Sequence, residues 1–186
     1  KEKLVNIISD MLAAKGFAEM MCNSLNPAAF YQQNEDFDRE HLVLLANPRS
    51  SDLNAMRQSL LFGGLSSVAW NINRQNTDLK LFEFGHCYFF RKQGDADPVP
   101  DNYYEHEHLD IYLTGNTGRI SWNNKTGPTD FYHIRSYVEM VFERLGLSLQ
   151  DLTYGESSKQ YFSESISYIH NKKVVAEAGK ISKKYL

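Results

Sequence analysis

The sequence predicts a single α+β domain in which an antiparallel sheet is flanked by helices. Three observations carry this prediction. Apolar residues recur at helical spacing in three stretches, which begin near residues 4, 61 and 131. Apolar residues alternate in other stretches, of which residues 79–90 form the longest. The 186 residues hold no internal repeat and no second composition, and they are enough for one substantial core.

The chain is expected to open with a helix and a strand. Leu4, Ile8 and Met11 share one helical face, and Gly16 is a suitable C-cap. Residues 17–25 then have the composition of a strand. The elements expected beyond it are a helical turn over residues 27–31, a polar loop over residues 32–40 and a short strand over residues 41–46.

A capped helix is predicted after the turn at Asn47-Pro48, because a residue before proline is disfavoured in the helical region. The hydroxyl or carboxylate side chains of residues 50–52 can each accept hydrogen bonds from the first backbone N–H groups of that helix. Its apolar face consists of Leu61, Leu65, Val68 and Ile72.

Residues 79–90 are predicted to form the central strand of the sheet. Their side chains alternate between two faces, and neither face is mainly polar, which is typical of a strand covered on both sides. Residues 91–104 follow as a loop, because glycine, proline and aspartate are frequent there.

The last third of the chain is predicted to contain one helix and four strands. Thr129 or Asp130 can cap a helix that starts near Phe131 and ends at Gly146. The strands expected are residues 109–115, 152–154, 163–170 and 172–180. Asn171-Lys172 is the expected hairpin turn between the last two, although a tight turn favours Asn-Gly.

Composition excludes several classes of protein. The formal charge of −3 and the pI of about 6.1 leave no broad basic face for a phosphate backbone. No apolar run approaches the roughly 20 residues that span a bilayer. Cys22 and Cys87 cannot form a disulfide framework, so we expect both to be buried, reduced thiols in predicted strands.

Two charged residues stand in apolar surroundings. Arg57 lies beside Met56 and Leu60, and it is interpreted either as part of an ion pair with Glu83 or as a surface arginine whose stem covers the core. Glu83 lies in an otherwise apolar strand and therefore needs a partner, because an unpaired buried carboxylate is unfavourable. A catalytic role for Glu83 is the less favoured interpretation, since no base or nucleophile adjoins it.

The run of residues 105–108, Glu-His-Glu-His, has the spacing of a metal site if it is extended. No third well-placed ligand is evident, however, so a solvated charged stretch is the favoured interpretation. Phosphate-binding loops, nucleophile elbows and zinc-protease motifs do not occur in the sequence.

One long ordered series of residues resembles the β chain of bacterial phenylalanyl-tRNA synthetase. It consists of Asn47, Pro48, Ser50, Leu53, Met56, Arg57, Ser59, Leu60, Leu61, Gly64, Leu65, Asn71, Asn73, Arg74, Leu81, Phe82, Glu83 and Gly85. The resemblance implies a class II aminoacyl-tRNA synthetase-like fold, in a catalytic-like module that does not itself catalyse. Residues 1–186 are then expected to form one non-catalytic domain, which is a fragment of a longer β chain.

Class II catalysis uses an arginine in motif 2 and another in motif 3 to hold anionic groups. The string nearest to motif 2 is Phe90-Arg91 followed by Lys92 and Gln93, with Gln where the motif has Glu. The last strands contain Gly179 and no arginine, since Arg144 is the final arginine of the chain. The sequence therefore predicts no catalytic residue, no cofactor-binding residue and no metal site.

The resemblance implies an assembly role within a larger enzyme. The whole enzyme attaches phenylalanine to its tRNA with ATP and Mg²⁺, and its α chain carries the active site in an α₂β₂ assembly. We expect tRNA to be bound through other domains, and the setting to be cytoplasmic without a membrane. Helix, glycine, strand and proline over residues 1–27 loosely resemble motif 1, by which class II synthetases pair. The structural or interface candidates are Leu4, Ile8, Met11, Arg57, Leu61, Leu65 and Glu83.

Two other functions remain open. One is a free-standing class II-like enzyme acting on an amino acid or a nucleotide, which would need a second anion-binding arginine. The other is a nucleic-acid-binding module, which the acidic balance disfavours. The family's usual L-H-P-G-R-S-A-like stretch is replaced here by residues 161–167, so no role of its histidine or arginine is transferred.

Overall fold

The computed structural model describes residues 1–91, 100–118 and 127–185. The chain divides into two compact units, and each unit is built from separate segments that alternate along the sequence. Unit 1 consists of Lys1–Ala18, Gln75–Leu81 and Ile111–Leu186. Unit 2 consists of Glu19–Arg74 and Phe82–Asp110. The expected loop residues Lys92 and Gln93 lie outside the described residues.

Helix α1 (Glu2–Ala14) opens unit 1 and confirms the first predicted helix. Gly16 follows it with φ 85, the left-handed conformation that favours glycine. Phe17 then contacts the ring of Tyr137 edge to face, with 4.8 Å between centroids. Lys80 Nζ donates to Tyr137 Oη at 3.0 Å, so Tyr137 contacts residues from the other two segments of unit 1.

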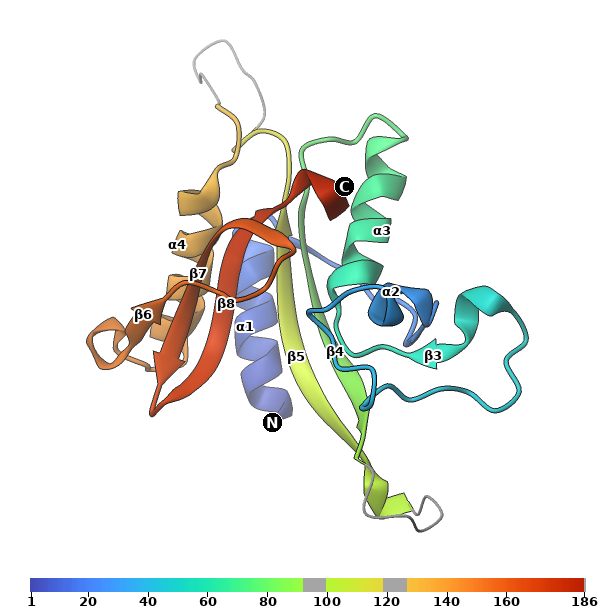
Figure 1. The fold of residues 1–186 in the computed structure, drawn as a ribbon. Coiled ribbons are helices and arrows are strands. Elements are labelled where there is room, and N and C mark those ends of the chain that lie inside the picture. The colour runs from blue at the N-terminus through green and yellow to red at the C-terminus, as the bar shows by residue number, and fades with distance from the viewer. Residues whose placement is uncertain (92–99, 119–126, 186) are drawn as a thin grey trace. The chain divides into compact units, whose positions relative to one another are not determined.

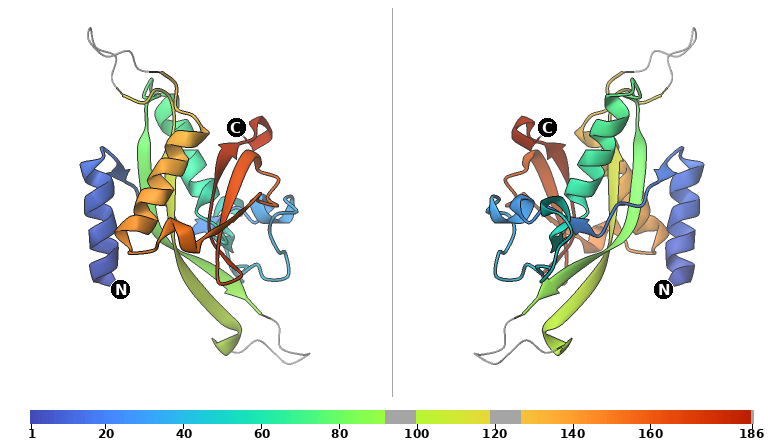
Figure 2. Two further views of the ribbon diagram at one scale, coloured as in Figure 1. Left: turned by 90° about the vertical axis from the view of Figure 1, so that its left-hand side faces the viewer. Right: turned by 90° about the vertical axis from the view of Figure 1, so that its right-hand side faces the viewer.

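The C-terminal part of unit 1 is a helix on a three-stranded antiparallel sheet. Helix α4 (Phe131–Arg144) packs on the last strand, as Figures 1 and 2 show. The strand order is β6-β7-β8. These strands are β6 (Thr153–Gly155), β7 (Phe162–His170) and β8 (Lys173–Ile181). Their buried core comprises Phe142, Leu152, Tyr168 and Ala178.

The predicted hairpin turn between β7 and β8 is confirmed. Asn171 and Lys172 have φ 50 and φ 64, the pair of positive values that defines a type I′ turn. Lys172 thus occupies a conformation that glycine adopts more readily. Short 3₁₀ helices complete unit 1 at Leu149–Asp151 and Lys183–Tyr185.

Unit 2 is built around buried Tyr31, whose ring meets those of Phe37 and Phe62 edge to face. Its hydroxyl accepts a hydrogen bond from Asn26 Nδ2 at 2.9 Å. Ala28, Leu42 and Ala55 complete this core. The elements of unit 2 are α2 (Ala29–Gln32), α3 (Leu61–Ile72), and the antiparallel pair β2 (Leu25–Asn26) and β3 (Ala55–Met56).

Three expectations for unit 2 were wrong. The strand expected over residues 17–25 is reduced to β1 (Ala18–Glu19) and the first residue of β2. The strand over residues 41–46 is a single bridge from Leu44 to Ala55. Ser50 caps only a short 3₁₀ helix, Ser51–Leu53, whereas α3 begins at Leu61 after an extended segment.

The extended segment before α3 is held by distant partners rather than by local preference. Met56 N donates to Val43 O at 2.9 Å, and Arg57 N donates to Ser24 O at 2.9 Å. At the helix start, Ser59 Oγ accepts from Leu61 N at 3.2 Å. The bonds of Met56 and Arg57 join residues distant in sequence, which is why a local cap rule placed the start of the helix too early.

The long strands β4 (Lys80–Phe90) and β5 (Tyr103–Leu113) lie side by side in the order β1-β4-β5 (Figure 2). The predicted central position of residues 79–90 is therefore confirmed. Strand β5 begins at Tyr103, six residues before the predicted start at residue 109, and directly follows the 3₁₀ helix Pro100–Asn102. Within the described ranges, no helix has the length and apolar character needed to cross a membrane.

Gly115 should be the glycine of unit 1 that tolerates substitution least. It has φ 69, and an added Cβ would lie 2.5 Å from Thr77 O and 2.8 Å from Asp78 Cα. Gly16 has a similar φ of 85 but open space around it. We expect Gly16→Ala to cost about 1–2 kcal/mol for the left-handed backbone. Gly115→Ala should cost a further ~1–3 kcal/mol for the backbone clash, measured by urea unfolding. Equal losses in the two variants would contradict this account.

Candidate functional site

The best-defined polar site in unit 2 is a buried ion pair between Arg57 and Glu83. Arg57 Nη1 lies 2.7 Å from Glu83 Oε1, and the two side chains are 5% and 0% exposed. Arg57 comes from the extended segment before α3, whereas Glu83 comes from β4. The sequence allowed two interpretations of Arg57. In the structure Arg57 forms the ion pair with Glu83 and is not a surface arginine.

The pair joins the segment around Cys22 to strand β4. Glu83 Oε1 accepts from Cys22 N at 3.1 Å, and Arg57 Nη1 donates to Cys22 O at 3.4 Å. Arg57 Nε donates to His86 O at 2.9 Å. The two charged side chains thus satisfy main-chain groups on two segments that are also joined by a backbone bond from Met20 N to Phe82 O at 2.8 Å.

The main chain of Arg57 completes the same junction. Its N–H donates to Ser24 O at 2.9 Å, and its carbonyl accepts from Tyr88 N at 2.8 Å. One residue therefore contacts both neighbouring segments through its backbone and its side chain. Because hydrogen bonds to charged groups contribute about 1.5–3 kcal/mol each, this cluster is a large element in the stability of unit 2. We call Arg57, Glu83 and the backbone of Cys22 the clasp.

Gly85 explains the spacing in the Leu-Phe-Glu-x-Gly series. Residues 83 and 85 lie on one face of β4, since side chains alternate along a strand. A Cβ on Gly85 would collide with Arg57 Nη2 and would lie 2.7 Å from Leu60 Cδ2. The position requires glycine for space rather than for backbone conformation. The sequence analysis did not predict this role of Gly85. The Glu-x-Gly spacing indicated it, because it places the two residues on one face of the strand.

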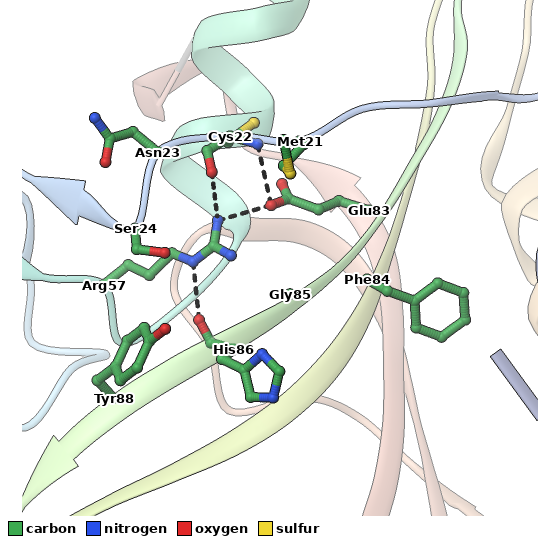
Figure 3. A pocket seen from close by; sticks show the side chains of 10 residues that line it. All are labelled: Met21, Cys22, Asn23, Ser24, Arg57, Glu83, Phe84, Gly85, His86 and Tyr88. Carbon is green, nitrogen blue, oxygen red and sulfur yellow. Dashed lines mark hydrogen bonds and ion pairs between the residues drawn. The ribbon is translucent and has the colours of Figure 1, made fainter. Parts of the chain in front are cut away.

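An open pocket of about 490 Å³ adjoins the clasp (Figure 3). Arg57 and Glu83 point toward each other in its lining, and Met21, which also lines it, is 93% exposed. Glu83 Oε2 is buried, and it has no hydrogen-bond partner within the described residues. The residues that line the pocket are Met21, Cys22, Asn23, Ser24, Arg57, Glu83, Phe84, Gly85, His86 and Tyr88.

The two cysteines are free thiols, as expected. Cys87 is buried in β4, and desolvation raises its pKa to about 12. Cys22 is half-buried and lies outside any strand, which corrects its expected position. Burial also raises the pKa of Cys22, although a hydrogen bond to Ser67 Oγ at 3.4 Å opposes the shift. Both thiols are therefore protonated near neutral pH and poorly suited to act as nucleophiles.

The Glu-His-Glu-His run of residues 105–108 lies in β5 and is extended, as a metal site would need. The His106 ring nevertheless meets Tyr104 edge to face and lies tilted against Phe89, with centroid distances of 5.4 and 6.0 Å. In the ranges that the structure describes, no group of three or more histidine, cysteine or acidic residues could hold a metal ion.

The candidate positions for motifs 2 and 3 have local partners. The Arg91 guanidinium lies 5.3 Å from the centroid of the Tyr104 ring, and its main-chain N–H donates to Asn102 O at 2.8 Å. Gly179 in β8 is crowded, since an added Cβ would lie 2.5 Å from Phe162 Cδ1 and 2.6 Å from Glu164 O. That glycine therefore has a packing role inside the sheet.

The remaining candidates differ in exposure. Ile8 and Leu61 are 3% and 7% exposed, so within this structure they are core residues. Met11 and Leu65 are partly buried, and Leu4 is 55% exposed. The clasp contains Arg57 and Glu83, whereas the structure does not bring the apolar candidates to it. Leu4 is thus the candidate most available to a partner.

Solved structures of aminoacyl-tRNA synthetases share this fold. A pyrrolysyl-tRNA synthetase from Desulfitobacterium hafniense gives a TM-score of 0.64 over 94% of this chain and 54% of its own, at 15% identity. A chain described as an ATP phosphoribosyltransferase regulatory subunit/histidyl-tRNA synthetase from Bacillus halodurans gives 0.58 over 82% and 35%, also at 15% identity. The fold is that of a class II aminoacyl-tRNA synthetase core.

The family comparison is more specific. The family described as phenylalanyl tRNA synthetase beta chain CLM domain matches residues 1–186. The phenylalanine–tRNA ligase beta subunit of Bacteroides thetaiotaomicron is 42% identical over 99% of this chain and 23% of its own length. That of Porphyromonas gingivalis is 33% identical over 88% and 20%. The chain belongs to the family of phenylalanyl-tRNA synthetase β-chain CLM domains, and it spans about a fifth of the length of these relatives.

Removal of one member of the clasp should be strongly destabilising. Glu83→Gln leaves the buried Arg57 charge without its counter-ion, and we expect a loss of about 3–5 kcal/mol in the free energy of unfolding. The double variant Arg57→Met with Glu83→Leu should lose less than the sum of its single changes, because no buried charge remains. Urea unfolding of both single variants and of the double variant measures these losses.

The exposed pair of Arg135 and Glu139, 2.7 Å apart on α4, provides the matched control. Arg135→Met should cost no more than about 1 kcal/mol, since that pair is partly solvated. If Glu83→Gln cost as little as this control, or if the clasp substitutions were additive, the structural role assigned to the clasp would be wrong.

Proposed function

We propose that this chain is the assembly domain of a phenylalanine–tRNA ligase β subunit. In this proposal residues 1–186 act as one catalytic-like but non-catalytic domain of a longer β chain. The domain packs on an α chain within an α₂β₂ enzyme and supports the active site there. The whole enzyme joins phenylalanine to its tRNA with ATP and Mg²⁺ in the cytoplasm, and tRNA is bound through other domains.

The observation that carries the proposal is that Arg57 and Arg91 contact other protein groups and that β8 has no arginine. A class II site needs guanidinium groups that face a cavity and hold phosphate or carboxylate oxygens. Here Arg57 is paired with Glu83 at 2.7 Å, and Arg91 lies over Tyr104. The chain has no arginine after Arg144, so β8 contributes none. These features favour a scaffold over an ATP-binding enzyme.

Exposed apolar side chains on the helices favour a partner chain. Leu4 on α1 is 55% exposed, and partly buried Met11 lies on the same predicted helical face. On α3, Ile72 is 42% exposed at the end of the predicted apolar stripe. Such residues suit the apolar centre of a subunit interface. The core residues Ile8 and Leu61 would then support these surfaces from below rather than touch the partner.

Association with an α chain tests the assembly role. The 186-residue chain mixed with a cognate α chain should form a complex heavier than either component, as measured by light scattering. Leu4→Glu should weaken the complex at least tenfold, because it places a charge in an apolar contact, and should leave the far-ultraviolet circular dichroism unchanged. Val174→Glu is the matched control, since Val174 is 57% exposed on β8 and belongs to no proposed contact. A folded chain that binds no α chain would contradict the proposal.

Catalytic assays test the non-catalytic assignment separately. The isolated chain should show no phenylalanine-dependent exchange of pyrophosphate into ATP and no saturable ATP binding by calorimetry. The mixture with the α chain provides the positive control for exchange. Saturable ATP binding by the isolated chain would instead support a free-standing class II-like enzyme that acts on an amino acid or a nucleotide.

A further inference from the structure

The first turn of α4 is closed by a capping box with an unusual member. Asp130, the N-cap, accepts at Oδ1 from the main-chain N–H of His133 at 3.1 Å. In return, His133 Nδ1 accepts from the main-chain N–H of Asp130 at 3.1 Å. Glutamate or glutamine commonly fills the second position of such a box, and neither has a side chain that changes charge near neutral pH as histidine does.

The same His133 nitrogen also meets the Asp130 carboxylate. Nδ1 lies 2.5 Å from Asp130 Oδ1, a hydrogen-bond distance at which one of the two atoms must carry a proton. As an acceptor from the Asp130 N–H, however, Nδ1 must be unprotonated. One nitrogen cannot hold both roles at once, so the two contacts require two states of the imidazole, one with Nδ1 unprotonated and one with Nδ1 protonated.

We propose that His133 is a protonation-dependent cap of α4. In the neutral state Nε2 carries the proton, Nδ1 accepts from the Asp130 N–H, and the capping box is closed. In the charged state Nδ1–H donates to the Asp130 carboxylate, and the Asp130 N–H loses its partner. The proton taken from solvent ends on Nδ1, and no other bond is made or broken.

The Asp130 carboxylate is the acidic group that lies against the protonated nitrogen of His133. The side chains of His133 and Asp130 are 42% and 55% exposed, so water reaches both. Three other ionisable groups of unit 1 have partners of their own: Asp78 with Asn116, Lys80 with Tyr137, and Arg135 with Glu139. Desolvation acts to raise the pKa of Asp130, but hydrogen bonds from His133 outweigh it and lower that pKa overall. Asp130 therefore stays ionised while a histidine titrates.

The charged state changes the interactions at the start of the helix, and it gains an ion pair with the Asp130 carboxylate. It removes one of the two reciprocal capping bonds, and it places a cation at the positive end of the helix dipole. The affected turn carries Phe131, which lines a shallow pocket of about 370 Å³ together with Tyr154 and Ile166. Acidification therefore acts on one wall of that pocket. This inference is independent of the proposed assembly role.

Nuclear magnetic resonance of the 186-residue chain with ¹⁵N label tests the proposal. Neutral His133 should be the Nε2–H tautomer, with Nδ1 unprotonated. The amide proton of Asp130 should shift with the same pH midpoint as the His133 ring. His133→Gln keeps an acceptor for the box and should abolish that step, leaving only the change at acid pH where carboxylates titrate.

His41 supplies the matched control. Its Nδ1 lies 2.9 Å from Asp38 Oδ2, also three residues apart, but at no helix start. His41→Gln should leave the Asp130 step unchanged. A neutral His133 with its proton on Nδ1, or an Asp130 step that persists in His133→Gln, would overturn the proposal.

Discussion

The ion pair between Arg57 and Glu83 is the contact on which unit 2 depends. It lies where the segment around Cys22, the extended approach to α3 and strand β4 come together. Charged side chains there satisfy main-chain groups of the Cys22 segment and of β4. Both side chains are nearly inaccessible, which makes the pair more sensitive to the loss of one partner than any surface pair.

This constraint also shapes the residues around the pair. Gly85 has no side chain because Arg57 and Leu60 occupy that space. Gly63 on α3 is similarly restricted, since an added Cβ would lie 2.9 Å from Cys22 Cβ. The spacing of arginine, glutamate and glycine in the family-like series is thus a packing requirement. It explains a recognisable sequence signature without any catalytic role.

The clasp and the proposed function are connected through chemistry. Three of the five N–H donors of Arg57 are bonded to a buried glutamate and to two backbone carbonyls, and the side chain is 5% exposed, so this arginine is poorly placed to hold a nucleotide phosphate. The class II fold is retained in this family member, while the ion pair of Arg57 and Glu83 holds segments of unit 2 together. This use of the arginine agrees with the proposed assembly role.

Much of this molecule followed from the sequence alone. The helical stripes placed α1 and α4, the alternation of residues 79–90 placed the central strand, and the polar pair Asn171-Lys172 marked the hairpin. Those features arise from periodicity and turn chemistry, which act over a few residues. A buried glutamate in an apolar strand also predicted its own need for a partner, because an unpaired charge is unfavourable in a core.

Only the tertiary structure decided the rest. The start of α3 at Leu61 depends on backbone bonds from Arg57 to Ser24 and Tyr88, which lie about 30 residues away on either side. The burial of Ile8 and the exposure of Leu4 could not be separated by a helical stripe, since both lie on it. The contact of Gly85 with the Arg57 guanidinium depends on which face of β4 packs against the segment that carries Arg57. Contacts between distant residues set these features, and a linear pattern does not contain them.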